Sequence, residues 1–417
     1  MGRNFSLDKL LHYAFEISSG AWNSLSRDRD RADGGLPRLL RSDVTARADI
    51  EFTTRCNLRC VYCVSQTPTY SGRDLDSAYL GDILECLKRR RVVTLGVSGH
   101  GETTTVANWQ HYCDRMLDNG LDLYLSTNLA RELSDEEITT LSRFHIIQVS
   151  CDTADLGLFK KLRRGADFRT VVYNMEKVRS RAILDGRRMP IFWWHCVVSD
   201  QTVWKLEEHV AYGLALGVKL FNFINLVVHP DLEECPAGLI TDMPRYDLER
   251  LPAYFDRIFH VIKSSGGSYI CDSLMERLSE KLAEQNTPAS DGLGQRHYAI
   301  QQSGMTRDCI DPWSYLKVAS NSGVMPCCRT PRPVGFLSDG LNLGDILNNS
   351  EMMRFRESLL TGELKDVCRT CNIRGWTEIG KLKFKVNLFL KFGKYLPVLH
   401  RWGILLPLLH RWRRSEL

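Results

Sequence analysis

Short apolar runs rich in β-branched and aromatic residues alternate along this chain with longer segments of helical periodicity. Such runs are typical of buried strands, and helical segments such as residues 76–91 and 202–217 lie between them. The expected strands are residues 48–54, 92–98, 121–128, 145–152, 191–199 and 219–228. Repeated strand–helix alternation predicts an α/β fold with a parallel sheet and right-handed crossovers. Six such units are too few for a closed eight-stranded barrel but enough for an open one.

The segment before this alternation has a different character. Residues 6–18 predict a helix capped by Ser6, and residues 27–35 are a charged linker. The start of the chain lacks the apolar region and cleavage site of a signal peptide, and no stretch reaches the roughly 20 apolar residues of a membrane-spanning helix. We therefore expect a cytoplasmic protein, and 417 residues are enough for two or three domains.

The formal net charge of +5 is unevenly distributed. Residues 381–417 carry nine Lys and Arg side chains against the single Glu416, so this tail is +8 and the preceding 380 residues sum to −3. A basic tail on a fold that is not basic argues against a nucleic-acid groove, and no nucleic-acid partner is expected.

The same tail contains a near-repeat, PVLHRW at 397–402 and PLLHRW at 407–412. Basic residues interleaved with Trp, Tyr, Phe and Leu favour peripheral contact with the inner face of a membrane. The alternative is a C-terminal helix that packs on the preceding domain.

Fourteen cysteines without an export signal indicate metal or redox chemistry rather than disulfides. Three lie at 56–63 and five between 309 and 371. The other six are isolated and are best explained as buried small hydrophobic residues.

The first cluster reads CNLRCVYC and follows the first expected strand, which places Cys56, Cys60 and Cys63 in a C-x3-C-x2-C spacing. Because ligands bind at the carboxyl ends of the strands in such folds, these thiols lie at the expected active edge. Thiolate sites usually have four protein ligands, and a set of three leaves a coordination position open, as in catalytic metal sites. A three-cysteine zinc knuckle with a distant fourth ligand is the alternative.

In this motif and its place after the first strand, the sequence resembles the radical S-adenosylmethionine (SAM) superfamily. The resemblance implies a partial (β/α)6 barrel in which Cys56, Cys60 and Cys63 hold a [4Fe–4S] cluster and SAM chelates the fourth iron. It also implies that an electron from the cluster cleaves SAM to a 5′-deoxyadenosyl radical, which abstracts hydrogen from an unactivated C–H bond. A flavodoxin or ferredoxin is implied as the reductant.

Companion motifs extend the resemblance over about residues 47–230. The sequence SGHGET at 98–103 follows the second strand, where the family binds the amino group of SAM. Gly101 and Glu102 fit that role, since a glycine lets the backbone approach the ligand and a carboxylate accepts from an ammonium. His100 and Thr103 depart from the family pattern.

The ends of later strands supply further residues that the resemblance assigns to SAM. In KKLRRGADF we favour Arg163 over Arg164 as the residue that meets the SAM carboxylate. The alternative for each of these residues is a surface charge or a helix cap, and His195 is either a site residue or a satisfied histidine on a barrel strand. The SAM contacts expected here are Asn128, Ser150, Asp152 and Arg163.

The second cysteine cluster has the spacings C-x17-C, an adjacent Cys328 and then C-x2-C, which does not provide the paired knuckles of a zinc ribbon. It resembles the SPASM/twitch extension of radical SAM enzymes, including PW after the first cysteine and GVMPCC at the hairpin. The resemblance implies one auxiliary [4Fe–4S] cluster, with Cys328 as a spare that could exchange with Cys327. The implied ligands are Cys309, Cys327, Cys368 and Cys371. A fully ligated cluster of this kind transfers electrons to or from a substrate radical.

Together these features predict five segments. They are an N-terminal helix and charged linker (1–46), a partial barrel (47–235), bridging helices (236–300), an auxiliary-cluster domain (301–380) and a basic amphipathic tail (381–417).

The substrate is the least determined part of the prediction. The family includes enzymes that oxidise or epimerise sugars and aminocyclitols, and enzymes that epimerise or crosslink peptides. Peptide-acting members often carry a leader-binding domain of about 80 residues. Only 46 residues precede the first strand here, which favours a sugar, cyclitol or lipid-linked glycan, with a peptide maturase as the alternative. A non-catalytic iron–sulfur protein would not need Glu102 or Arg163, and a membrane-docking adaptor would not need the cysteine motifs.

Overall fold

The structure is a computed structural model that describes residues 36–68, 70–232, 235–284, 301–371, 373–395 and 397. The predicted N-terminal helix, the charged linker and nearly all of the repeat in the tail lie outside these residues.

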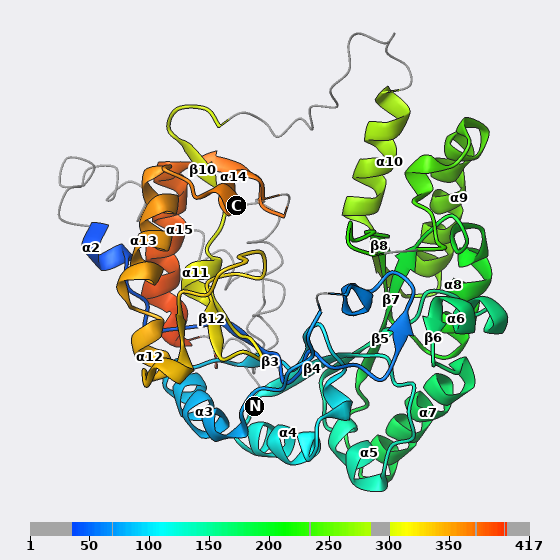
Figure 1. Ribbon diagram of the computed structural model, residues 1–417, viewed down its shortest axis with the longest axis horizontal. Coiled ribbons are helices and arrows are strands. Elements are labelled where there is room, and N and C mark those ends of the chain that lie inside the picture. The colour runs from blue at the N-terminus through cyan, green and yellow to red at the C-terminus, as the bar shows by residue number, and fades with distance from the viewer. Residues whose placement is uncertain are drawn as a thin grey trace, which may run out of the picture.

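A single ten-stranded sheet runs through the molecule (Figure 1), in the order β13-β12-β11-β1-β3-β4-β5-β7-β8-β9. The six expected strands are all present and pair in parallel, which confirms the predicted α/β fold. They are β1 (Arg47–Ile50), β3 (Thr94–Gly96), β4 (Asp122–Thr127), β5 (Ile146–Ser150), β7 (Ile191–Val198) and β8 (Leu220–Asn225). Burial alternates along the long strands: one face is fully buried and the other is half-buried, so the sheet has a packed outer face and a more open inner face.

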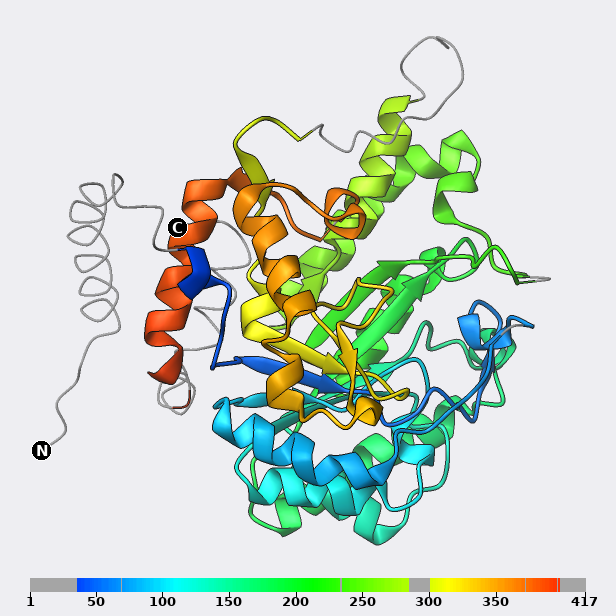
Figure 2. The ribbon, with the colours of Figure 1, turned by 60° about the vertical axis from the view of Figure 1, so that its left-hand side comes forward.

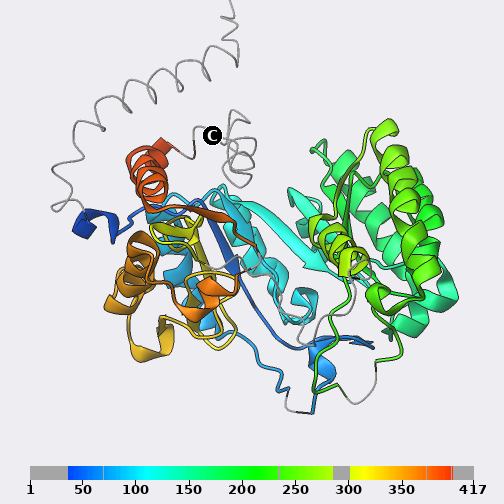
Figure 3. The same cartoon turned by 90° about the horizontal axis from the view of Figure 1, so that it is seen from above.

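Helices cover the outer face of this sheet, as Figures 1 and 3 show from two directions. The segment expected to be helical at 76–91 contains α3 (Leu80–Arg89), whose buried Leu80, Ile83, Leu84 and Leu87 form one apolar stripe. The other covering helices are α4 (Trp109–Asp118), α5 (Asp135–Leu141), α6 (Leu156–Leu162), α7 (Phe168–Leu184) and α8 (Leu206–Ala215). The expected helical segment 202–217 contains α8, and its last residue, Gly217, has a φ of +69°, the left-handed conformation that glycine adopts after helix ends.

The sheet extends beyond the expected strands at its β8 edge. The three-residue strand β9 (Ser268–Ile270) pairs in parallel with β8. It lies between α9 (Arg245–Ser264) and α10 (Asp272–Glu284), the helices found in the predicted bridging segment. Both helices contribute buried residues such as Leu248, Phe255 and Leu274 to the main core, so they enlarge the barrel layer.

At the other edge the cysteine-rich region joins the same sheet. Strand β11 (Tyr315–Val318) pairs in parallel with β1, and β12 (Gly323–Met325) and β13 (Gly335–Phe336) continue from it as antiparallel strands. The auxiliary region is therefore bonded directly to the first strand of the barrel.

A second core lies under this region, among α11 (Asp311–Ser314), α13 (Ser350–Thr361) and α15 (Ile379–Phe392). Trp313, Leu359 and Phe389 are buried at its centre. A two-stranded sheet of β10 (Met305–Arg307) and β14 (Trp376–Glu378) borders this core, and α14 (Asp366–Arg369) contributes the buried Cys368 to it. The short helix α12 (Leu343–Ile346) instead packs its Leu343 and Ile346 into the main core.

Helix α15 contains the first part of the predicted basic tail. Its Leu382, Val386 and Phe389 are buried in the second core, and Lys385 Nζ binds the Asp308 carboxylate at 2.7 Å. The helix lies beside α2 (Leu36–Leu39), as Figure 2 shows. This part of the tail is thus a packed helix. Within the described ranges, no helix combines the length and apolar character needed to span a membrane.

Two buried arginines hold the segment before β1 between the two cores. Arg90, at the end of α3, donates from Nε to the Thr45 hydroxyl at 2.9 Å. Arg356, on α13, donates from Nη1 to the Leu40 carbonyl at 2.7 Å and to Asn348 Oδ1 at 3.0 Å. Burial lowers the pKa of Arg356 to about 9. The N-terminal segment therefore ties the barrel and the auxiliary region together through polar contacts as well as through the sheet.

Candidate functional site

The loop after β1 carries the three cysteines of the first cluster at the carboxyl end of the parallel strands. Cys56 is exposed, Cys60 is buried and Cys63 is intermediate. Each sulfur has a polar donor nearby: the Leu58 amide lies 3.4 Å from Cys56 Sγ, and the Ser65 hydroxyl lies 3.1 Å from Cys63 Sγ. Arg163 Nη1 lies 4.0 Å from Cys60 Sγ.

These surroundings fit three thiolate ligands of an iron–sulfur cluster. Burial raises the pKa of the Cys60 thiol to about 11, and the positive charge of Arg163 acts in the opposite direction. A thiolate at this position needs a cation such as iron to stabilise it, and hydrogen-bond donors to sulfur favour the anionic form. Among the described residues no three His, Cys, Asp or Glu side chains lie close enough to hold one metal ion. The thiolates of an iron–sulfur cube each bind a different iron, so its ligands need not converge on one point.

Arg163 is held by Asp152 through a two-pronged ion pair. Its Nε and Nη2 donate to the two Asp152 carboxylate oxygens at 2.9 and 2.8 Å, and both side chains are buried. The Val197 amide donates to Asp152 at 3.0 Å, and the Tyr62 hydroxyl donates to the same carboxylate. Arg163 also pairs by backbone with Cys60, because β6 (Arg163–Arg164) is antiparallel to β2 (Arg59–Cys60). Asp152 thus orients Arg163 and leaves its Nη1 directed toward the cysteine loop.

The loop predicted to meet the SAM amino group is packed tightly against the same cysteine loop. A side chain at Gly101 would collide with the backbone of Thr54 and Arg55, and the Glu102 amide donates to the Arg55 carbonyl at 2.8 Å. Glu102 Oε1 accepts from Thr104 and from the Thr127 hydroxyl, whereas the one partner of Oε2 among the described residues is the Asn128 backbone amide at 2.7 Å. Oε2 can therefore accept a further hydrogen bond, as a SAM ammonium requires.

Asn128 links this loop to the cysteines. Its Nδ2 donates to Asn57 Oδ1 at 2.8 Å and lies 3.8 Å from Cys56 Sγ. Leu129, the next residue, has a φ of +48°, an uncommon conformation for a leucine that concentrates backbone strain at this edge. Ser150 ends β5 on the half-buried inner face, directly opposite His195 of β7.

Glu51 joins the predicted SAM loop to the auxiliary region. It is buried, and its Oε1 accepts from the His100 amide at 2.9 Å. Its Oε2 accepts from the amide and the hydroxyl of Ser320, in the turn between β11 and β12, at 3.1 and 3.0 Å. Gly99 must lack a side chain, because a Cβ there would collide with Glu51. One carboxylate therefore fixes two loops that come from opposite ends of the chain.

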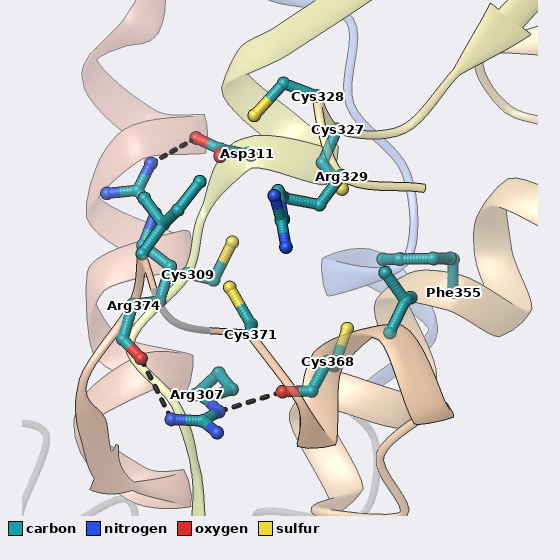
Figure 4. Close-up of a pocket in the computed structure, with 12 residues that line it drawn as sticks. Arg307, Cys309, Asp311, Cys327, Cys328, Arg329, Phe355, Cys368, Cys371 and Arg374 are labelled. Carbon is teal, nitrogen blue, oxygen red and sulfur yellow. Dashed lines mark hydrogen bonds and ion pairs between the residues drawn. The ribbon is translucent and has the colours of Figure 1, made fainter. Parts of the chain in front are cut away.

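The second cluster of cysteines lines a hollow of about 420 Å³, part of which is open to solvent. Figure 4 shows the sulfurs of Cys309, Cys368 and Cys371 beside the space in the middle of the view, with Cys327 across it near Arg329 and Cys328 at the top. All five thiols lie on the wall of the hollow. The choice of Cys327 over Cys328 as the fourth ligand stays a prediction.

Two arginines fix the walls of this hollow and give it a positive border. Arg307 donates from Nε to the Cys368 carbonyl at 2.8 Å and from Nη1 to the Arg374 carbonyl at 3.0 Å, and its guanidinium stacks on Trp376 at 3.7 Å. Arg374 pairs with Asp311 at 2.7 Å. Burial raises the pKa of Cys368 to about 12 and that of Cys309 well above its usual value. Four thiols converging on a hollow with cationic walls fit an anionic iron–sulfur cluster.

Three residues of this geometry were missed in the sequence: Glu51, Tyr62 and Ser320. Glu51 had a usable signal, since it and Asp49 alternate with apolar residues in an expected strand. Tyr62 lies inside the cysteine motif itself, but nothing local shows that its hydroxyl reaches Asp152. Ser320 has no signal, because its partner lies 269 residues away.

Comparison with known protein families identifies two domains. Residues 50–192 match the radical SAM superfamily, and residues 309–372 match an iron–sulfur cluster-binding domain, SPASM. The chain therefore contains a radical SAM domain followed by a SPASM domain, and the resemblance predicted from the cysteine motifs is confirmed. These domains imply iron–sulfur clusters and SAM as cofactors.

Curated relatives match part of the chain. Mycofactocin maturase MftC of Mycolicibacterium smegmatis is 27% identical over 172 residues, which are 41% of this chain and 42% of MftC. MftC of Mycobacterium ulcerans is 24% identical over the same length and covers 44% of that protein. The matches thus span less than half of these relatives.

Solved structures share the fold over most of the chain at low identity. Streptococcus suis SuiB has a TM-score of 0.54 and 13% identity over 84% of this chain and 79% of SuiB. The structure of anSMEcpe with AdoMet and the Kp18Cys peptide has a TM-score of 0.53 and 15% identity over 86% of this chain and 99% of anSMEcpe.

Glu51 provides a test of how the SAM loop is positioned. In Glu51→Gln, one carboxylate oxygen becomes an NH2 group that cannot accept from His100 or Ser320. We expect a rise of about tenfold in the dissociation constant for SAM, the cost of a buried donor left unpaired. The measurement is anaerobic calorimetric titration of the reconstituted protein with SAM, with iron content unchanged.

The matched control is Asp114→Asn, which removes a carboxylate that pairs with Arg143 at 2.7 Å on the outer helices, away from the loop. Equal SAM affinity in Glu51→Gln and Asp114→Asn would show that Glu51 does not position the loop.

Proposed function

We propose that this protein is a peptide-modifying radical SAM enzyme, a maturase that acts on a C–H bond of a peptide substrate. The observation that carries the proposal is the pair of cysteine sites on one sheet, an open set of three and a closed set in the SPASM hollow. When bound, the clusters and SAM supply one-electron chemistry and a 5′-deoxyadenosyl radical that abstracts hydrogen.

The chain's own residues hold and orient these groups. Cys56, Cys60 and Cys63 are the proposed ligands of the catalytic cluster. Glu102 offers Oε2 to the SAM ammonium, and Arg163 is fixed by Asp152 so that one edge of its guanidinium faces the cysteine loop. Gly101, Asn128 and Ser150 complete the proposed SAM site by backbone approach and hydrogen bonding.

The auxiliary hollow is proposed to hold a second [4Fe–4S] cluster bound by Cys309, Cys327, Cys368 and Cys371. A cluster with four protein ligands has no open iron, so it is suited to electron exchange with a substrate radical rather than to SAM cleavage. A flavodoxin or ferredoxin is the proposed source of the first electron.

The comparisons favour a peptide over the sugar or glycan that the short N-terminal segment suggested. The relatives are named maturases of mycofactocin, one structure of SuiB contains the precursor peptide SuiA, and anSMEcpe was solved with a peptide. A short N-terminal segment is weak evidence against a peptide, because recognition can be supplied by a separate protein.

The assignment of the two clusters can be tested by their iron content. The reconstituted protein should contain about eight irons. Replacing Cys56, Cys60 and Cys63 together by Ala should halve the iron and abolish formation of 5′-deoxyadenosine, measured by chromatography after dithionite reduction.

Replacing Cys368 and Cys371 by Ala should also halve the iron, but it should retain reductive SAM cleavage while product formation stops. Because metal ligation supports small domains, the soluble fraction of each variant is compared first. Reductive cleavage of SAM by the triple variant would contradict the assignment.

The substrate class is tested by turnover with candidate peptides. The full chain, reconstituted and reduced, is incubated with SAM and short peptides encoded beside its gene. We expect a peptide to stimulate 5′-deoxyadenosine formation and to lose hydrogen or exchange it for deuterium from D2O, detected by mass spectrometry. Turnover of nucleotide sugars or lipid-linked glycans in place of every peptide would replace the peptide proposal with the alternative.

Membrane contact through the last part of the tail remains a proposal, supported by the Arg and Trp side chains of residues 398–417. A truncation that tests it must keep α15, whose apolar side chains are buried in the second core. We expect the full chain, but not a chain ending at Pro397, to sediment with anionic liposomes at low salt. Equal recovery of both proteins in the supernatant would remove this proposal.

A further inference from the structure

The inner face of the sheet carries a row of polar side chains on four neighbouring strands, outside the predicted SAM contacts. The register places Ser126 of β4 opposite Gln148 of β5, and His195 of β7 opposite Asn222 of β8. All four side chains are half-buried and belong to the inner-facing set of their strands. The row therefore crosses the inner face of four strands, β4, β5, β7 and β8, that are neighbours in the sheet (Figure 1).

Hydrogen bonds link the members of this row and converge on His195. The Ser126 hydroxyl donates to Gln148 Oε1 at 2.9 Å, so the amide nitrogen of Gln148 faces the next residue. That nitrogen contacts His195 Nδ1. From the opposite side, Asn222 Nδ2 lies 3.0 Å from the same Nδ1.

This arrangement favours one tautomer of His195. With the amide nitrogens of Gln148 and Asn222 both facing it, Nδ1 acts as the acceptor through its single lone pair, one amide at a time, which assigns the imidazole proton to Nε2. Burial lowers the pKa of His195 to about 4, which keeps the ring neutral at physiological pH.

The Nε2–H group is left available. Among the described residues, Nε2 has no hydrogen-bond partner. It is also not fully buried, so it borders accessible space. His209 of α8, which packs against the outer face of the same strand, differs. It is fully buried and stacked on Trp194 at 4.5 Å, and its Nε2 lies 3.1 Å from Cys196 Sγ. His209 is a core histidine, whereas His195 presents a donor to the interior.

The charge of the surroundings selects the ligand. Every member of the row is neutral, and the nearby charged groups, Arg163 and Asp152, neutralise each other in a buried ion pair. A carboxylate or phosphate would meet no free cation in the row. A neutral acceptor such as an amide carbonyl needs only a fixed donor.

We propose that His195, oriented by Gln148 and Asn222, is a substrate-binding residue whose Nε2–H donates to a carbonyl oxygen of the peptide substrate. The proposal rests on the peptide-modifying function proposed above. His195 contacts the substrate, while Gln148 and Asn222 are positioning residues that fix its tautomer.

Nuclear magnetic resonance of the full, reconstituted chain labelled with 15N-histidine tests the donor and the ligand class directly. The variant His195→Asn identifies the His195 signals by their loss. We expect protonated Nε2 and unprotonated Nδ1. We also expect the Nε2 signal to shift on titration with N-acetylglycine methylamide and not with a methyl glycoside.

Each other result overturns the proposal. A proton on Nδ1 would remove the donor, and no shift with the amide would remove the carbonyl site. A shift with the glycoside alone would assign the row to a different substrate class. Because this titration requires no turnover, it stands apart from the peptide-modification experiment, and failure of either can be recognised independently.

Kinetics with a peptide that the enzyme modifies provides the second measurement. Asn at position 195 offers its amide oxygen where Nδ1 lies, so His195→Asn keeps an acceptor for Gln148 and Asn222 but lacks the Nε2 donor. We expect KM for the peptide to rise about tenfold, the effect of one lost hydrogen bond. His111→Asn, the same change at an exposed position on α4, should leave KM unaltered. An unchanged KM in His195→Asn would contradict the proposal.

Discussion

The parallel pairing of β1 with β11 is the contact on which both cysteine sites depend. Four residue pairs, from Arg47 with Tyr315 to Ile50 with Val318, form the ladder between strands that lie more than 260 residues apart in the chain. The loop that leaves β1 carries Cys56, and the loop that follows β12, the hairpin partner of β11, carries Cys327 and Cys328. Because a ladder fixes register to a single residue, the two sites are held in one frame rather than in two hinged domains.

Side chains reinforce this ladder on the inner face of the sheet. Asp49 of β1 accepts hydrogen bonds from the hydroxyls of Tyr124, two strands away, and Tyr315 of β11. Tyr124 can reach across β3 only because Gly96 lies between them, and any side chain there would collide with both partners. Glu51, in the residue directly after β1, makes the corresponding link to Ser320 and the predicted SAM loop. A half-buried Asp49 and a buried Glu51 thus join the barrel to the auxiliary region, and each accepts from donors on both sides.

Local sequence patterns predicted the elements whose signals are contained within a short window. The six main strands and the helical segments at 76–91 and 202–217 were predicted from apolar runs and periodicity, and both cysteine sites from their spacing and the family resemblance. Strand β9 was missed because three residues carry no periodicity, and the β1–β11 pair was missed because no local pattern encodes a partner so distant. Asp152 and Arg163 were predicted as separate SAM contacts. Their mutual ion pair depends on the β2–β6 pairing, which only the fold brings about. In the tail, buried Leu382, Val386 and Phe389 follow a helical spacing that the basic residues obscured.

Two neighbouring zones of the barrel interior differ in charge, and this difference limits what each can bind. At the carboxyl ends of the strands, charge is concentrated: thiols, the Asp152–Arg163 pair and Glu102 surround the proposed SAM site, where an ionic cofactor must be held. Beside that site on the inner face, Ser126, Gln148, His195 and Asn222 are neutral and bond to one another. Neutral groups that are already paired cost little to bury and offer little to a charged ligand. In the role proposed for His195, recognition by this row comes from the position of a single donor, Nε2–H, and not from charge. A peptide backbone suits such a site, because its carbonyl groups are neutral, directional and present in every residue.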